Sequence, residues 1–301
     1  MKEIKTAALI GLGALGILYG QRMPEVRVIV DRSRLERYSR EEVTCNGRPC
    51  AFSYVTPEEG QPVDLVMTAV KATALEEAAA SMKRFVGPDT VIVSVLNGIS
   101  SEETLERFYP GHCLWCVAIG LDAVREGRAL RYKNAGVLQI GERDGGDSPR
   151  LRAVGAYLEK CGIACEICGD ILYKQWNKLM INVGLNQAAA VHGYTYGQLR
   201  ADAAVRAEML EAMEEVIAVA NRAGVPLPRD SAVRWMDGAM DTLAAEGRPS
   251  MGQDVLARRP TEVGEFAGLI CRLGREYGIP TPVNDFYLRR IREIEAGYGE
   301  D

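Results

Sequence analysis

The chain has 301 residues, of which 47% are hydrophobic, and this composition favours a folded protein with a sizeable core, divided into two domains, over a disordered chain. Its 36 Lys and Arg residues and 41 Asp and Glu residues give a formal net charge of -5 and are scattered along the sequence. Because no basic block is present, we expect neither nucleic acid nor an anionic membrane as a partner.

The first twenty residues superficially resemble a secretory signal peptide, since the charged MKEIK precedes an apolar run. Four glycines (Gly11, Gly13, Gly16 and Gly20) and the absence of a small-residue cleavage site favour instead a strand, a tight turn and a helix. No other apolar run reaches the roughly 18 residues of a membrane span. The eight cysteines are therefore expected to be reduced thiols of a cytoplasmic protein.

The first half alternates short apolar runs with helical stretches, which is typical of a parallel sheet with crossover helices. The expected strands are residues 5–11, 26–31, 64–70, 90–96, 113–120, 136–141 and 164–168, and the expected helices include 75–85 and 148–162.

The segment GLGALG, from Gly11 to Gly16, fits the G-x-G-x-x-G pattern directly after an apolar strand and at the start of a helix. Gly11 would permit the tight turn, Gly13 would let the backbone approach a pyrophosphate, and Gly16 would allow close packing of helix on strand. Leu12, Ala14 and Leu15 complete the expected cradle. The alternative is a glycine-rich turn needed only for packing.

The residues at the end of the second expected strand allow two interpretations of which dinucleotide is bound. Asp31 could accept a hydrogen bond from a ribose 2'-hydroxyl, whereas Arg32 and Arg34 could hold a 2'-phosphate. We predict NADPH, with NAD(H) as the alternative, although both arginines could equally be solvated charges of the following helix.

Cys161, Cys165 and Cys168 form the one dense cysteine cluster. A zinc or redox site there would need a fourth ligand at a recognised spacing, so we interpret the cluster as buried thiols and expect no metal.

After Gly169 the pattern changes to long amphipathic stretches such as 203–224 and 261–278, which predict helices. The expected domains are thus 1–168 and 169–301.

The segment WNKLMINVGLN, read as a helix, places Lys178, Asn182 and Asn186 on one face. A nicotinamide cofactor implies hydride transfer to a ketone, whose oxygen must then be protonated. His112 and His192 lie in no motif, whereas a partly desolvated Lys178 would be a good acid, and the two asparagines could bind a small substrate. A hydrogen-bonded network between helices is the structural alternative, but a buried lysine would then need a carboxylate.

The segment 250–266 could supply that carboxylate through Glu262. Glu262 follows Pro260 and could instead be an ordinary first-turn carboxylate of a helix. Ser250 with Gln253 could likewise be only a capping box.

These motifs together resemble the ketopantoate reductase (2-dehydropantoate 2-reductase) family over nearly the whole chain. The resemblance rests on GLGALG, AVKA around Lys71, LNG around Asn97, WNKLMINVGLN and SMGQDVLARRPTE. It implies an α/β fold: a Rossmann-type dinucleotide-binding domain followed by an all-helical C-terminal domain. It also implies reduction of 2-dehydropantoate to (R)-pantoate with NADPH, in pantothenate and coenzyme A biosynthesis.

The resemblance further implies individual roles. Lys178 matches the proton donor, and Glu262 matches a glutamate that contacts the cofactor near this lysine. Asn182, Asn186 and Ser250 match substrate-binding positions, Asn97 lies between nicotinamide ribose and substrate, Lys71 contacts the cofactor, and Ala123 contacts it through the main chain.

One departure concerns the substrate. Where many relatives have Asn-Gly shortly after the Lys/Asn helix, this chain has Tyr196 before Gly197. The alternatives are therefore a reductase of another branched 2-oxo acid, or a dinucleotide-binding redox sensor without turnover. A homodimer stays open, because the amphipathic helices could cover either an intrachain core or a dimer face.

Overall fold

A computed structural model describes residues 3–299, which fall into two compact units. The first unit ends at Lys174 and the second begins at Gln175, within helix α6. This division lies a few residues after the predicted boundary at residue 168, since the first residues of α6, which begins at Ile171, belong to unit 1.

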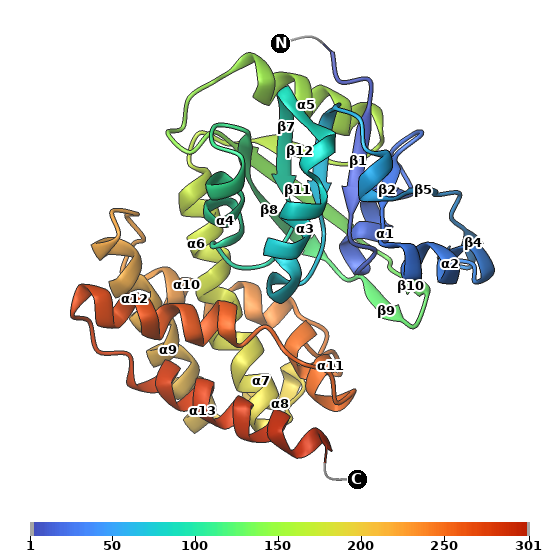
Figure 1. Cartoon of the computed structure of the whole chain (residues 1–301). Helices are drawn as coiled ribbons and strands as arrows, with labels where there is room; N and C mark the ends of the chain where they lie inside the picture. Colours follow the sequence, from blue (N-terminus) through green and yellow to red (C-terminus); the bar gives the residue numbers. More distant parts are fainter. Residues whose placement is uncertain (1–2, 300–301) are drawn as a thin grey trace. The chain divides into compact units, whose positions relative to one another are not determined.

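Within the described residues, unit 1 contains an eight-stranded sheet in the order β12-β11-β8-β7-β6-β1-β2-β5 (Figure 1). Its strands are β1 Ala7–Ile10, β2 Arg27–Ile29, β5 Ser53–Val55, β6 Val63–Thr68, β7 Val86–Ser94, β8 Cys113–Leu121, β11 Ala135–Gly141 and β12 Cys165–Ile167. Each predicted strand is present, and β5 is an additional edge strand. The α/β fold class is confirmed.

One strand pairing differs from the predicted parallel sheet. Strand β11 is antiparallel to β8, with Val137 opposite Ile119, whereas all other neighbouring pairs in this sheet are parallel. The chain between β8 and β11 forms short strands rather than a crossover helix, so β11 returns in the opposite direction. These short strands belong to a second, four-stranded sheet made of β3 Thr44–Cys45, β4 Arg48–Pro49, β9 Val124–Glu126 and β10 Ala129–Arg131.

Helices cover both faces of the large sheet, as the two cores show. Residues of α1 and α5 belong to the core that contains Leu9 and Leu65, and residues of α3 and α4 belong to the core that contains Ile10 and Val66. The helices of unit 1 are α1 Ala14–Gly20, α2 Arg32–Arg40, α3 Leu75–Ser81, α4 Ser101–Phe108 and α5 Pro149–Lys160. Burial on both faces explains why the parallel strands read as continuous apolar runs.

Unit 2 contains helices joined by short connections, and its described residues form no strand. Its elements are α6 Ile171–Ile181 (which begins in unit 1), α7 Gln187–His192, α8 Tyr196–Ala201, α9 Ala203–Arg222, α10 Ser231–Met236, α11 Ser250–Leu256, α12 Leu269–Tyr277 and α13 Pro282–Ala296, with π-helical turns at Asn182–Asn186 and Gly264–Gly268. Asp202 caps α9 by accepting hydrogen bonds from Ala204 and Val205. The apolar face of α9 supplies much of the core, because Met209, Met213 and Val216 are fully buried.

Candidate functional site

The turn after β1 has the geometry that its glycines predict. Gly11 has a φ of +97°, and a Cβ there would lie 2.6 Å from the carbonyl carbon of Ala69. A Cβ at Gly16 would lie 2.0 Å from the carbonyl oxygen of Gly11. The packing of strand and helix is therefore enough by itself to require glycine at both positions.

Gly13 is different, because the protein itself leaves space in front of it. It caps α1 with extended backbone and no side-chain hydrogen bond, and a Cβ there would meet only the carbonyl oxygen of Ala69, at 3.4 Å. Leu12 is buried, while Ala14 and Leu15 form the half-buried start of α1. A cradle that is open only at the second glycine fits a pyrophosphate that approaches the backbone there.

The other predicted cofactor residues follow the carboxyl ends of neighbouring parallel strands. Arg32 follows β2, Lys71 follows β6, Asn97 follows β7 and Ala123 follows β8. The chain leaves β1 towards β2 and later returns to β6 on the other side of β1, so the glycine turn lies at a topological switch point. In open α/β sheets, ligands bind at this position. Lys71 and Arg32 are exposed, whereas Asn97 and Ala123 are half-buried.

A buried polar set beside Asn97 was not predicted from the sequence. Ser94, the last residue of β7, donates from its hydroxyl to the Ser101 hydroxyl over 2.8 Å. Ser101 in turn donates to the Glu102 carboxylate over 2.8 Å, and the Cys116 backbone N–H donates to the same carboxylate over 3.1 Å. Glu102 is 1% exposed. These hydrogen bonds connect the two ends of the loop that contains Asn97. In the sequence, Ser101 and Glu102 resemble an ordinary first helical turn, so their role is not visible there.

The helical unit brings three of the predicted substrate residues together. The side-chain amide of Asn186 lies 3.4 Å from Oδ1 of Asn182 and 3.5 Å from Oγ of Ser250. Asn186 is buried, Asn182 is half-buried and Ser250 is exposed. Lys178, also half-buried, lies on α6 one turn before Asn182. These hydrogen bonds are long, so a ligand could replace them at little cost.

The capping-box interpretation of Ser250 is wrong. Pro249 is the N-cap of α11, Ser250 is its first residue, and no side-chain cap hydrogen bond is formed. Gln253 donates instead to the carbonyl oxygen of Arg248 over 3.0 Å. The Ser250 hydroxyl is thus directed to Asn186 rather than to its own helix.

The helix predicted from WNKLMINVGLN is present, but its last turn is π-helical. The π turn covers Asn182–Asn186, and a second π turn, Gly264–Gly268, begins two residues after Glu262. Such turns are rare and are often found at functional sites. Gln187, fully buried, donates to the carbonyl oxygen of Val183 in the first π turn and accepts from the N–H of Ala267 in the second, both over 3.0 Å.

We expect the Gln187→Leu substitution to destabilise the helical unit by about 2–4 kcal/mol. The substitution keeps the volume but leaves the buried Ala267 N–H and Val183 carbonyl without this partner, and each such loss costs about 1–3 kcal/mol. Urea denaturation followed by far-ultraviolet circular dichroism measures the change. An unfolding free energy equal to that of the wild type would contradict the bridging role.

Glu262 lies just before the second π turn rather than in the first turn of a helix, so its predicted alternative role as a first-turn carboxylate is wrong. The backbone on either side of it is held: the N–H of Thr261 donates to Glu295, and the N–H of Val263 donates to the Thr261 hydroxyl. Glu262 itself is half-buried.

Tyr196 anchors the segment that leads to Ser250. Its backbone N–H donates to the carbonyl oxygen of Gly247 over 2.9 Å, and a Cβ at Gly247 would lie 2.9 Å from the Tyr196 ring. Gly197 donates to the carbonyl oxygen of Ala245 over 2.8 Å. Burial raises the pKa of Tyr196, so the ring stays neutral.

The two histidines and the clustered cysteines lie in surroundings typical of residues with a structural role. A ring nitrogen of His112 lies 2.7 Å from the carbonyl oxygen of Thr90, and one of His192 lies 2.9 Å from the Glu208 carboxylate. Burial raises the pKa of Cys165 to about 12 and that of Cys168 to about 11.

Among residues 3–299, no group of three or more His, Cys, Asp or Glu side chains is placed to hold a metal ion. No helix in the same range is long and apolar enough to cross a membrane.

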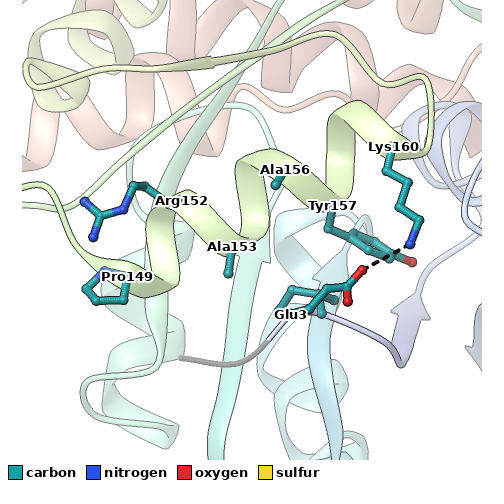
Figure 2. Close-up of a pocket in the computed structure, with 8 residues that line it drawn as sticks. Glu3, Pro149, Arg152, Ala153, Ala156, Tyr157 and Lys160 are labelled. Carbon is teal, nitrogen blue, oxygen red and sulfur yellow. Dashed lines mark hydrogen bonds and ion pairs between the residues drawn. The ribbon is translucent and has the colours of Figure 1, made fainter.

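A separate groove runs along one face of α5 (Figure 2). Its cationic side chains already have carboxylate partners: Lys160 Nζ lies 3.1 Å from Glu3, and Arg152 is ion-paired with Asp147. None of the predicted site residues lines this groove. It therefore does not compete with the glycine turn as the dinucleotide site.

Comparisons with known proteins match both units. The family model for Ketopantoate reductase PanE/ApbA matches residues 7–145, and the model for its C-terminal domain matches residues 170–295. A 2-dehydropantoate 2-reductase of Archaeoglobus fulgidus is 25% identical over 300 residues, which cover 98% of this chain and 99% of that protein.

Solved structures agree with these matches. A PanE/ApbA family ketopantoate reductase from Ralstonia eutropha JMP134 superposes with a TM-score of 0.83 at 25% identity, over 98% of this chain and 100% of that one. A D-mandelate dehydrogenase, solved with NADH and anilino(oxo)acetate, has the same fold, with a TM-score of 0.86 at 23% identity over 98% of this chain and 99% of that one. Since the two family models together span most of the sequence, the chain belongs to the ketopantoate reductase family.

Proposed function

We propose that this protein reduces 2-dehydropantoate to (R)-pantoate with a nicotinamide dinucleotide. Members of the family are oxidoreductases that act on CH–OH groups and their 2-oxo acid counterparts, which supports the reaction class. The observation that carries the proposal is the grouping of Asn182, Asn186 and Ser250 one turn from Lys178. Which dinucleotide is used depends on the residues after β2.

Each of these side chains has a role that its chemistry suits. A reduced nicotinamide, when bound, supplies a hydride to C2 of the keto acid. Lys178 would donate a proton from Nζ to the keto oxygen, so that the product leaves as a neutral alcohol. Asn182, Asn186 and Ser250 offer amide and hydroxyl groups to the carboxylate and the hydroxyl of the substrate. Glu262 would orient Lys178 and the dinucleotide.

The glycine turn would hold the pyrophosphate through backbone amides at the start of α1. Lys71, Asn97 and Ala123 follow strands that end at the same edge of the sheet as this turn. Asn97 would contact both the nicotinamide ribose and the substrate.

The test is oxidation of NADH and NADPH by purified protein with 2-dehydropantoate and with branched 2-oxo acids that lack its hydroxyl. We expect kcat/KM to be at least about 100-fold higher for 2-dehydropantoate, because a site built to bind a hydroxyl rejects analogues without one. Equal rates with the analogues would favour a reductase of another branched 2-oxo acid. Tyr196, which replaces an asparagine found in many relatives, is the reason to consider this alternative. Dinucleotide binding without turnover of any 2-oxo acid would favour a redox sensor.

We expect the Asn182→Ala substitution to raise KM for the keto acid about 5- to 30-fold, as the loss of one or two kcal/mol of hydrogen bonding predicts. The dissociation constant of the dinucleotide, measured by fluorescence titration, should stay the same. Asn177→Ala is the matched control, because Asn177 is also a half-buried asparagine of this helix but precedes Lys178. Equal KM values for the two variants would remove Asn182 from the substrate site.

A further inference from the structure

A shallow groove lies within unit 1 at the carboxyl ends of β1, β2 and β6. Its lining is mostly apolar, and two of its four polar residues, Asp31 and Arg34, follow the end of β2. The apolar lining consists of Ile10, Ile29, Val30, Pro57, Val70, Ala74 and Ala78, and the polar lining consists of Asp31, Arg34, Glu77 and Ser81. In this fold, the adenosine half of a dinucleotide lies against the end of the second strand.

Asp31 is held in place in this groove by the start of α2. Its Oδ1 atom accepts hydrogen bonds from the backbone N–H of Arg34 and from the Ser33 hydroxyl, each over 2.7 Å. These two hydrogen bonds stabilise the ionised carboxyl and hold the pKa of Asp31 below its usual range. Because Asp31 is the N-cap of α2, its carboxylate cannot turn away from the groove without uncapping the helix.

The nearby arginines already have carboxylate neighbours. Arg34 Nε lies 3.4 Å from Oδ2 of Asp31. Hydrogen bonds from the backbone and Thr56, together with the charge of Arg32, hold the pKa of Glu58 below its usual range, and the same causes act on Glu59. The groove lining itself contains two carboxylates, Asp31 and Glu77, against one guanidinium. A 2'-phosphate would therefore meet more negative than positive charge in the groove lining, with Asp31 held in place by the helix cap.

We propose that Asp31 selects NADH over NADPH in this protein, by accepting a hydrogen bond from the ribose 2'-hydroxyl and repelling a 2'-phosphate. The inference rests on the proposed use of a nicotinamide dinucleotide. It reverses the NADPH preference that Arg32 and Arg34 predict from sequence alone. The reason is that Asp31 is fixed by the helix cap, whereas both arginine side chains are exposed and Arg34 lies against Asp31 itself.

The experiment measures dissociation constants by isothermal titration at constant ionic strength, with no keto acid present. The probes are NADH, NADPH and two fragments, AMP and adenosine 2',5'-bisphosphate, which differ by the 2'-phosphate. For the wild type we expect NADH to bind at least about 10-fold more tightly than NADPH, and AMP more tightly than the bisphosphate. Asp31→Asn keeps the helix cap, since asparagine caps as well as aspartate, and should reduce the NADH preference at least about 5-fold.

Two further variants sharpen the result. Asp89→Asn makes the same change of charge at an exposed position of β7 and should leave the preference unchanged. Arg34→Ala should weaken NADPH binding by less than about 3-fold, and a loss of 10-fold or more would overturn the proposal. Tighter wild-type binding of NADPH than of NADH would also overturn it while leaving dinucleotide use intact. Binding of neither dinucleotide would overturn both this inference and the proposed function.

Discussion

The Lys178→Ala enzyme is expected to lose about 100-fold to 10,000-fold in kcat for reduction of the keto acid, which is the contribution typical of a positioned general acid. The alkoxide that forms at C2 would have to take its proton from water instead. A loss of that size corresponds to roughly 3–5 kcal/mol in the activation barrier. Single-turnover oxidation of the reduced dinucleotide, followed by absorbance, measures the chemical step directly.

The control for this variant is Lys174→Ala, since Lys174 is a half-buried lysine one turn earlier on the same helix. It removes the same charge and should keep near-native turnover. Dinucleotide binding should be unchanged in both variants, because the glycine cradle belongs to β1 and α1. Near-native turnover by Lys178→Ala would show that another group protonates the substrate.

The Gly13→Ala protein is expected to fold normally and to bind the dinucleotide about 10- to 100-fold more weakly. Gly13 has a φ of -71°, which alanine adopts readily, and the new Cβ would meet protein atoms only at 3.4 Å. Its stability should therefore stay within about 1 kcal/mol of the wild type. The Cβ would instead crowd the pyrophosphate. Over-packing of this kind typically costs about 1–3 kcal/mol, and here the loss would fall on the binding free energy of the dinucleotide.

Gly16→Ala provides the contrast. Its Cβ would lie 2.0 Å from the Gly11 carbonyl oxygen, so the backbone must move and the protein should lose roughly 2–3 kcal/mol of stability as well as binding. Thermal unfolding and dinucleotide titration of both variants separate the two roles. Equal loss of stability in Gly13→Ala and Gly16→Ala would mean that the motif serves packing alone.

Much of the first unit could be predicted from the sequence because its signals are local. Apolar runs of four to eight residues gave the strands of the large sheet, and the spacing of Gly11, Gly13 and Gly16 after such a run gave the turn. Helix periodicity gave α5 and α9 in the same way. The antiparallel return of β11 was missed, since its direction depends on the connection from β8 rather than on its own composition.

The candidate site was only partly accessible from sequence. The positions of Lys178, Asn182 and Asn186 on one helix follow from their spacing, but the π turn at Asn182–Asn186 carries no recognised sequence signal. Gln187 and Glu102 read as ordinary helix residues, yet both are buried and hydrogen-bonded to segments distant in the chain. Their roles depend on which backbone groups lie opposite them.

The sequence by itself determined the two-part organisation, the order of the strands along the chain and the residue types available for chemistry, because these depend on hydrophobic periodicity and on side-chain identity. Only the tertiary structure decided how those residues are used. Ser250 contacts Asn186 instead of capping its own helix, and Asp31 is fixed by a cap while Arg34 folds back onto it. Hydrogen bonds and charges act through distances of a few ångströms, and these distances exist only once the chain has folded.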